Sequence, residues 1–298
     1  MTLTDRLHRA QTFGNVGPEE YMVPFPNLGS LLEGKTIKEG NQVLFAGPGG
    51  TVAEVQQAVT SWLPELRSRG VEPGTVVTLT ASDPRLFLVQ AFAVWTLGGI
   101  LYLGQDPFDR VQIRLSDRIV PSTPEMEFRL RWRPHLETEA VWQEKGDTCI
   151  RLSHYNLLIN AYALHRVLAL PPGRRLLVQA KVQDTADLLC QCLLPLLGNH
   201  TLVKSGPDVV IGSEADCTYR VARSWRRLVS TDPPTLYYLP EHTAFVALNE
   251  HLFPYVDLRL EDDQVVFSGH AAMLGYATEA ETARVLTKEG YRVPLPAI

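Results

Sequence analysis

The chain has 298 residues, of which 45% are hydrophobic, 20% charged and 8% aromatic. This composition is typical of a folded globular protein, because a disordered chain carries fewer apolar residues and a membrane protein far more. The formal net charge of −5 excludes the strongly basic surface with which most nucleic-acid-binding proteins attract their ligand. The length allows one large domain or two modest ones.

Targeting and redox signals are weak in this sequence. The first residues contain no apolar run of signal-peptide length, and no window reaches the ~18 apolar residues of a membrane-spanning helix. The four cysteines form no Cys-x-x-Cys pair and have no histidine at zinc-ligand spacing. We therefore expect a cytoplasmic protein without a membrane span, with buried thiols and no metal site.

The first predicted helix begins after a short strand and a turn. Residues 42–46 are an apolar run that predicts a strand, and the Pro-Gly-Gly sequence at 48–50 predicts a turn. Binding of an anion by this glycine-rich turn is the less favoured alternative. Thr51 and Glu54 have the spacing of a capping box, so we expect a helix that ends at Gly70.

A second helix and strand follow directly. Residues 76–80 predict a strand, and Asp83 followed by Pro84 is typical of a helix N-terminus. Residues 86–97 are apolar on nearly every side, which predicts a buried helix before a strand at 100–103.

The same order of elements recurs later in the chain. Ser153 is expected to begin a helix that runs to residue 168, followed by a strand at 176–178. Asp184 is expected to begin an apolar helix that runs to residue 197, followed by a strand at 201–203. Parallel strands need crossover helices, so the repeat predicts an α/β fold in which duplicated αβαβ units form parallel-rich sheets flanked by helices.

The remaining segments complete the predicted organisation. Charged and apolar residues alternate at 125–133, which predicts a half-buried strand with a solvated charged face, and a phosphate site on its arginines is the less favoured alternative. The basic segment 219–227 is expected to be a solvated helix face, with a docking patch for an acidic partner as the less favoured alternative. Short apolar runs after residue 205 predict a smaller β-rich region at the C-terminal end. The expected divisions are an N-terminal extension at 1–26, α/β units at 27–135 and 136–205, and the β-rich region at 206–298.

Several segments, taken in order, resemble the N-terminal domain of the adenylate-forming superfamily, which includes acyl-CoA synthetases, peptide-synthetase adenylation domains and luciferases. The segment most specific to that family is Val266–Tyr276, followed by similarities near 281–291. The other similar segments are 27–33, 51–77, 97–103 and 152–158.

The resemblance implies a reaction in which a carboxylate attacks ATP to form an acyl-adenylate, which then passes its acyl group to a thiol. Family members carry a phosphate loop rich in Gly, Ser and Thr, a Thr-Glu pair whose Glu holds magnesium, and a Thr-Gly-Asp step before a C-terminal lid domain. Here residues 140–151 contain a single glycine, Gly146, between Glu144 and Asp147. Glu144 and Asp147 would repel phosphate oxygens, so we expect the phosphate loop to be lost.

The other two features also depart from the family. Glu241 and His242 stand where the family has Thr and Glu, so either Glu241 has moved into the metal role or, as we favour, metal binding is lost. Gly290-Tyr291 is not followed by the family's Asp, and we expect the family's lid domain to be missing. The resemblance places the candidate ligand-binding residues at Ser153, His154, Tyr238, Glu241, His242 and Gly269.

Three hypotheses follow. The leading one is a non-catalytic relative of acyl-CoA synthetases that needs no cofactor and serves as a binding or partner-assembly module, for an acyl or adenylate-like molecule or as a homodimer. The alternative is a divergent AMP-forming ligase that uses ATP, Mg²⁺ and CoA with a separate lid domain. A structural subunit of a larger complex is the third. A Ser153–His154 catalytic dyad is disfavoured, because neighbours on a helix point about 100° apart.

Overall fold

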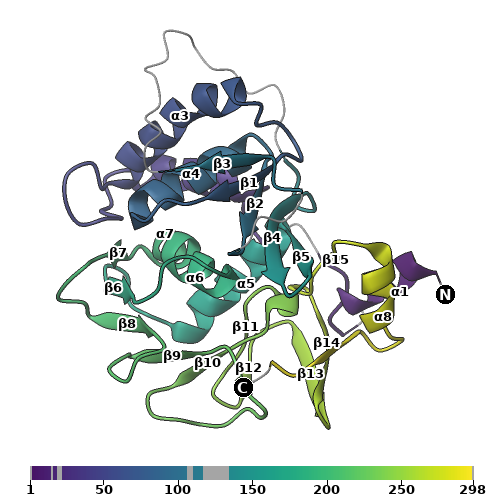
Figure 1. The fold of residues 1–298 in the computed structure, drawn as a ribbon. Coiled ribbons are helices and arrows are strands. Elements are labelled where there is room, and N and C mark those ends of the chain that lie inside the picture. The colour runs from purple at the N-terminus through teal and green to yellow at the C-terminus, as the bar shows by residue number, and fades with distance from the viewer. Residues whose placement is uncertain (1, 15, 19–21, 106–109, 117–133, 297–298) are drawn as a thin grey trace.

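The fold contains three sheets with helices packed between and around them (Figure 1). The structure is a computed structural model that describes residues 2–14, 16–18, 22–105, 110–116 and 134–296. The strand expected at 125–133 lies outside the described residues. The helical elements are α1 (Leu3–Ala10), α2 (Leu28–Glu39), α3 (Val52–Ser68), α4 (Pro84–Thr96), α5 (His154–Leu168), α6 (Thr185–Leu188), η2 (Leu189–Leu193), α7 (Leu194–Gly198), η3 (Pro240–His242) and α8 (Glu279–Val285).

The first sheet has six strands in the order β15-β5-β4-β2-β1-β3. Strands β3, β1, β2 and β4 run parallel, whereas β4, β5 and β15 are antiparallel neighbours. The bounds are β1 (Val76–Leu79), β2 (Ile100–Leu103), β3 (Ile113–Leu115), β4 (Glu139–Lys145), β5 (Thr148–Ser153) and β15 (Gly275–Tyr276).

The second sheet has seven strands in the order β12-β11-β10-β9-β8-β6-β7. The strands from β7 to β10 are parallel, and β11 and β12 close the other edge in antiparallel pairings. The bounds are β6 (Arg175–Val178), β7 (Thr201–Leu202), β8 (Val209–Gly212), β9 (Tyr219–Ala222), β10 (Thr235–Tyr238), β11 (Phe245–Leu248) and β12 (His251–Leu252).

A small antiparallel sheet of three strands lies at the C-terminal end of the chain. It contains β13 (Val256–Glu261), β14 (Gln264–Gly269) and β16 (Tyr291–Pro294). Helix α1 reaches this end of the molecule, where the Arg6 side chain donates a hydrogen bond to the Leu286 carbonyl at 3.0 Å. The predicted fold class, parallel-rich sheets flanked by helices with a smaller β-rich region, is confirmed. The strands of residues 206–298 are divided among all three sheets.

The helix starts expected from capping residues are confirmed. Thr51 accepts from the Glu54 amide and the Glu54 carboxylate accepts from the Thr51 amide, which is the reciprocal pattern of a capping box. Ser153 and Asn156 form the same pattern at the start of α5. These side chains satisfy backbone donors that the first helical turn leaves free, so each helix begins at a defined residue.

Two predictions of secondary structure, the strand at 42–46 and the continuous helix at 184–197, were wrong. Residues 42–46 are not a strand, because Val43 and Phe45 make only isolated bridges to Thr51 and Leu202. The helix expected at 184–197 is interrupted by the π turn η2, which separates α6 from α7.

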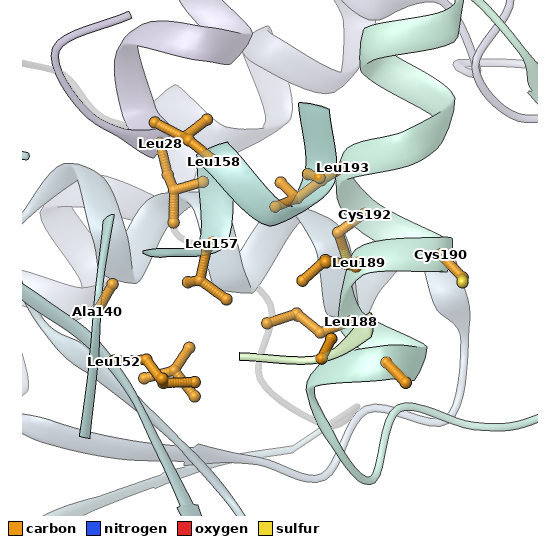
Figure 2. Packing of buried hydrophobic residues seen from close by; sticks show 14 of the residues in the cluster. Leu28, Ala140, Leu152, Leu157, Leu158, Leu188, Leu189, Cys190, Cys192 and Leu193 are labelled. Atoms are coloured by element: carbon orange, nitrogen blue, oxygen red, sulfur yellow. The ribbon is translucent and has the colours of Figure 1, made fainter. Parts of the chain in front are cut away.

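The core fills the space between the two large sheets. Buried side chains of α5 and of the α6-η2-α7 segment pack there against β4, β5 and α2 (Figure 2). The labelled members are Leu28, Ala140, Leu152, Leu157, Leu158, Leu188, Leu189, Cys190, Cys192 and Leu193. All four cysteines are buried free thiols, and burial raises the pKa of Cys149 to about 12. Within the part of the chain that the structure describes, no helix is both long and apolar enough to cross a membrane.

Candidate functional site

A closed β-hairpin occupies the segment in which the sequence resemblance places a phosphate loop. Strands β4 and β5 pair in register up to Lys145 and Thr148, which leaves a turn of two residues, Gly146 and Asp147. Gly146 has φ +56°, a left-handed conformation that glycine adopts without steric cost. A two-residue turn connects antiparallel strands directly, so this segment has no loop long enough to surround a triphosphate.

Glu241 forms a buried ionic contact beside this hairpin. Its side chain is fully buried on η3, and its Oε1 pairs with the Nζ of Lys145, the last residue of β4. The Tyr276 hydroxyl donates to the same oxygen at 2.9 Å. Burial and the Glu241 carboxylate raise the pKa of Tyr276, so this hydroxyl stays protonated and remains a donor.

The second carboxylate oxygen of Glu241, Oε2, has different surroundings from Oε1. Glu241 Oε2 is buried and has no hydrogen-bond partner among the described residues. The Glu241 carbonyl accepts from the Met273 amide at 2.8 Å, which fixes η3 against the segment before β15. Lys145 is therefore the cation that compensates Glu241, and its side chain, 37% exposed, lies between the carboxylate and solvent.

His242 is buried directly beside Glu241. Its ring lies edge-on to Phe267, with ring centres 5.7 Å apart, and within the part of the chain that the structure describes neither ring nitrogen has a hydrogen-bond partner. Burial lowers the pKa of His242 to about 4, so the ring is neutral at pH 7. A Cβ at Gly269 would lie 2.9 Å from His242 Nε2 and collide with the Tyr255 carbonyl, so glycine is required here.

Ser153 and His154 are parts of a helix start, not a catalytic pair. The Ser153 hydroxyl contacts the Asn156 side chain at 3.0 Å within the capping box. His154 Nδ1 accepts from the Leu28 amide of α2 at 3.3 Å, and burial lowers the pKa of His154 to about 3. A neutral ring that accepts a backbone hydrogen bond ties α5 to α2.

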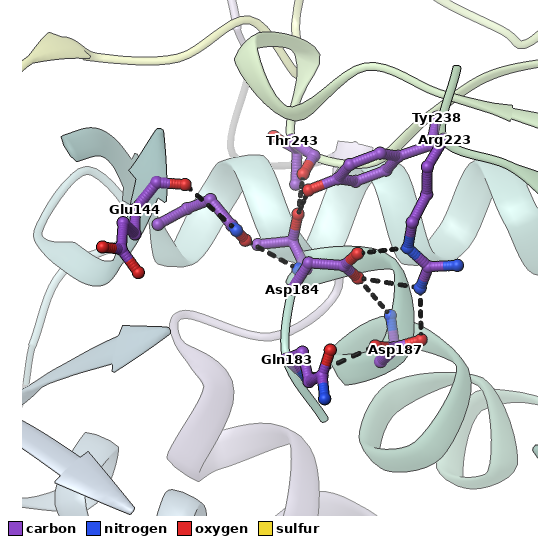
Figure 3. Close-up of polar contacts among 9 residues, drawn as sticks. Glu144, Gln183, Asp184, Asp187, Arg223, Tyr238 and Thr243 are labelled. Atoms are coloured by element: carbon purple, nitrogen blue, oxygen red, sulfur yellow. Dashed lines mark hydrogen bonds and ion pairs between the residues drawn. The ribbon is translucent and has the colours of Figure 1, made fainter. Parts of the chain in front are cut away.

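Tyr238 ends β10 and faces a different group of residues from Glu241. Its hydroxyl lies 3.4 Å from Thr185 Oγ1, and Arg223 lies over its ring at 5.9 Å from the centre (Figure 3). Burial raises the pKa of Tyr238 well above its ordinary range. The structure thus brings Glu241, His242 and Gly269 together, whereas Tyr238 joins the Arg223 group and Ser153 and His154 cap α5.

The Arg223 group is the principal feature that the sequence reading missed. Arg223 Nε donates to Asp184 at 2.6 Å and its Nη2 donates to Asp187 at 2.6 Å (Figure 3). Residues 219–222 form strand β9 and not the expected solvated helix, so Arg223 follows a strand and turns inward. Burial and the neighbouring Asp184 raise the pKa of Asp187 to about 6, and Arg223 opposes that rise.

The sequence indicated that Asp184 caps a helix, but not that Asp184 and Asp187 both pair with Arg223. The Asp184 side chain caps α6 by accepting from the Asp187 amide at 2.9 Å, as its position predicts. Nothing local indicates that Arg223 compensates both carboxylates. Among the residues that the structure describes, no group of three or more His, Cys, Asp or Glu side chains could hold a metal ion.

Comparison with known proteins places this geometry in a recognised fold. No protein-family model and no curated protein matches the chain by sequence. Among solved structures, unliganded O-succinylbenzoate coenzyme A synthetase (MenE) from Bacillus subtilis superposes with a TM-score of 0.72 at 10% identity, covering 90% of this chain and 75% of that chain. Apo MatB from Rhodopseudomonas palustris gives 0.72 at 14% identity with the same coverage.

The N-terminal domain of FACL13 from Mycobacterium tuberculosis defines the matching portion more closely. It has a TM-score of 0.67 at 12% identity, covering 90% of this chain and 95% of that domain. The resemblance found in the sequence is confirmed at the level of the fold. The chain folds as the N-terminal domain of adenylate-forming enzymes does.

Proposed function

We propose that this chain is a non-catalytic relative of the acyl-CoA synthetases that acts in the cytoplasm as a binding or partner-assembly module and does not adenylate carboxylates. The observation that carries this proposal is the contact between Lys145 and Glu241 at the end of the β4–β5 hairpin. Two further features of the same region support it.

The first supporting feature is the hairpin itself. Phosphate cradles depend on several backbone amides that point into a concave loop. The turn at Gly146 and Asp147 has only two residues, and Asp147 adds a negative charge beside the place where phosphate oxygens would lie. These residues do not fit a magnesium-bound triphosphate.

The second feature is the charge balance at Glu241. A carboxylate that holds Mg²⁺ must present its oxygens to the ion, and Mg²⁺ requires near-octahedral oxygen coordination. Glu241 instead has one oxygen bonded to Lys145 and Tyr276, and the other is buried. The Lys145 ammonium supplies the positive charge from within the chain, and this arrangement needs no metal.

An ATP–pyrophosphate exchange assay tests the proposal directly. With Mg²⁺ and a panel of aliphatic and aromatic carboxylic acids, we expect no exchange above the protein-free blank, while an active acyl-CoA synthetase in the same buffer provides the positive control. Exchange that disappears in Glu241→Gln or His242→Asn would contradict the proposal and favour the divergent ligase. Exchange that arises only when a separate lid domain is added would favour the same alternative.

Assembly is the second part of the proposal, and we infer that the chain forms a homodimer. Among the described residues, the exposed large apolar side chains come from three stretches of chain: Phe13 and Val16, Ile37 and Val43, and Leu252 and Leu260. Multi-angle light scattering at high protein concentration should give twice the monomer mass. A monomer under those conditions would remove homodimerisation from the proposal without affecting the expected absence of exchange.

A further inference from the structure

We propose that a cavity between the two α/β units binds an amphipathic organic anion, a molecule with one acidic head group and an apolar body. The cavity has a volume of about 630 Å³ and opens to solvent. Its lining includes Phe45, Leu202, Arg85, Arg175 and Lys204. None of the six candidate site residues lines it, so this proposal does not depend on the function proposed above.

The position of the cavity in the fold favours ligand binding. Val178 and Leu202, which line it, are the last residues of the parallel strands β6 and β7, and Arg175, the first residue of β6, lines it as well, so the cavity runs along β6 to its carboxyl end. Pro84, the first residue of α4, lines the opposite side. In open α/β sheets, ligands bind beyond the carboxyl ends of the strands, and ligand pockets have volumes of about 300–1,000 Å³.

One part of the cavity lining is apolar. Leu177, Val178 and Leu202 contribute aliphatic side chains, and Phe45 contributes a ring from the segment before α3. Burying an apolar ligand surface against such a wall is favourable by about 25 cal/mol per Å² removed from water. This apolar part of the lining fits the body of an organic ligand, which a free inorganic ion does not have.

The charges that line the cavity are mainly positive. Arg85, Arg175 and Lys204 supply three cationic groups, and Asp83 is the single carboxylate among the lining residues. Asp83 caps α4, where its Oδ1 accepts from the Arg85 and Leu86 amides at 3.0 Å each, and its Oδ2 lies 3.8 Å from Lys204 Nζ, so Arg85 and Arg175 carry the net positive charge of the lining. In a chain with a net charge of −5, this local excess of positive charge attracts an anion.

Backbone carbonyls hold the two arginines in place without cancelling their charge. Arg85 Nη1 donates to the Pro48 carbonyl at 2.7 Å, and Arg175 Nη2 donates to the Ser205 carbonyl at 2.8 Å. Gly49, with φ +69°, lets the Arg85 guanidinium approach so closely that a Cβ there would collide with it. The glycine-rich turn at 47–50 thus positions an arginine that can bind an anion.

Guanidinium groups held this way are suited to a planar or tetrahedral oxyanion. Each has further N–H donors, and charge-assisted hydrogen bonds to carboxylate, sulfonate or phosphate oxygens are among the stronger polar contacts in proteins. The occupant that satisfies both the cationic groups and the apolar wall is therefore an organic acid of moderate size.

The experiment compares two fluorescent probes that share one ring system. 1-Anilinonaphthalene-8-sulfonate carries an anionic sulfonate, whereas N-phenyl-1-naphthylamine has the same rings without it, and both brighten in apolar surroundings. We expect wild-type protein to bind the sulfonate probe saturably at one site and the uncharged probe at least roughly tenfold more weakly.

Three variants test which groups are responsible. The double variant Arg85→Gln with Arg175→Gln should weaken binding of the sulfonate probe by roughly tenfold or more and leave the uncharged probe unchanged. Ala46→Trp, which places a large ring at an exposed residue of the lining, should weaken both probes. Arg227→Gln, a matched change at an exposed arginine outside the lining, should change neither.

Circular dichroism melts of each variant establish that it is folded before binding is compared. Wild-type affinity for the sulfonate probe in the folded double variant would overturn the proposal, as would wild-type binding in Ala46→Trp. An equal loss of both probes in the double variant would show that the arginines only shape the cavity, and this would overturn the assignment of an anionic ligand.

Discussion

The two α/β units begin their second helices in the same way but complete them differently. In the first unit, Asp83 caps α4, which continues as an unbroken helix of 13 residues. In the second unit, Asp184 caps α6, which gives way after four residues to the π turn η2 and then to α7, where Pro195 stands in the first turn. The same local pattern of an aspartate, an apolar run and a glycine therefore encodes two different helices.

The surroundings of the two caps differ even more. Asp83 is half exposed, and Lys204 at 3.8 Å is a solvent-exposed neighbour. Asp184 is nearly buried and pairs with Arg223 at 2.6 Å. One unit thus uses its cap only to start a helix, whereas the other also uses it to bind the end of β9 to the core. The difference predicts that replacing Asp83 and replacing Asp184 lower the free energy of unfolding by unequal amounts.

The largest effect is expected at Arg223. Breaking a buried ion pair from one side costs about 3–5 kcal/mol, and because a third of the Arg223 side chain is exposed we expect Arg223→Ala to lower the free energy of unfolding by about 2–4 kcal/mol. Urea denaturation at pH 7 measures this loss. Arg226→Ala, at an exposed pair with Asp263, should cost less than about 0.5 kcal/mol, and similar losses in the two variants would contradict the assignment.

Replacing the two caps tests the comparison between the units most directly. Asp83→Ala removes only an exposed cap and should cost about 1 kcal/mol. Asp184→Ala removes a cap and a partner of Arg223, so its cost in the same urea experiment should be about 1–2 kcal/mol larger. Equal costs would mean that the contact between Asp184 and Arg223 contributes nothing to stability.

The pH dependence of stability should reveal the buried titratable groups. Burial lowers the pKa of His154 to about 3 and that of His242 to about 4. The folding stability that these neutral rings contribute is therefore complete above pH 6.5 and is lost as the pH falls toward 4. Asp187 acts in the opposite direction, because its pKa is raised to about 6 and its contribution is lost as the pH rises through 6.

Thermal melts between pH 4 and 7 separate these contributions. The wild type should lose stability on acidification, because the buried histidines outnumber Asp187. Asp187→Asn removes the opposing group and should make that loss steeper, whereas Asp147→Asn, on the exposed hairpin turn, should leave the slope unchanged. A shallower loss in Asp187→Asn would contradict the raised pKa.

An effect comparable with the loss of the exposed cap is expected at the hairpin turn. Gly146→Ala places a Cβ on a left-handed residue and should cost about 1–2 kcal/mol of stability. Asp147→Ala, the neighbouring position without positive φ, is the matched control and should cost less. A Gly146→Ala variant as stable as the control would indicate that the segment is not the tight hairpin described above.

Local rules predicted the helix starts because their causes lie within three residues. Thr51, Asp83, Ser153 and Asp184 each accept a hydrogen bond from a backbone amide two or three positions ahead. The candidate site was predicted less completely. Glu241 and His242 were identified through the resemblance, but Lys145, 96 residues away from Glu241, was not identified as the partner of that carboxylate.

The sequence by itself determined the α/β class, the starts of most helices and the scarcity of glycine between residues 140 and 151, because capping, hydrophobic periodicity and residue identity act locally. The tertiary structure alone decided that Lys145 compensates Glu241, that Arg223 turns inward, and that Arg85, Arg175 and Lys204 surround one cavity. Each of these contacts joins segments that only the order of strands in the sheets brings together, and hydrogen bonding within one segment carries no information about that order.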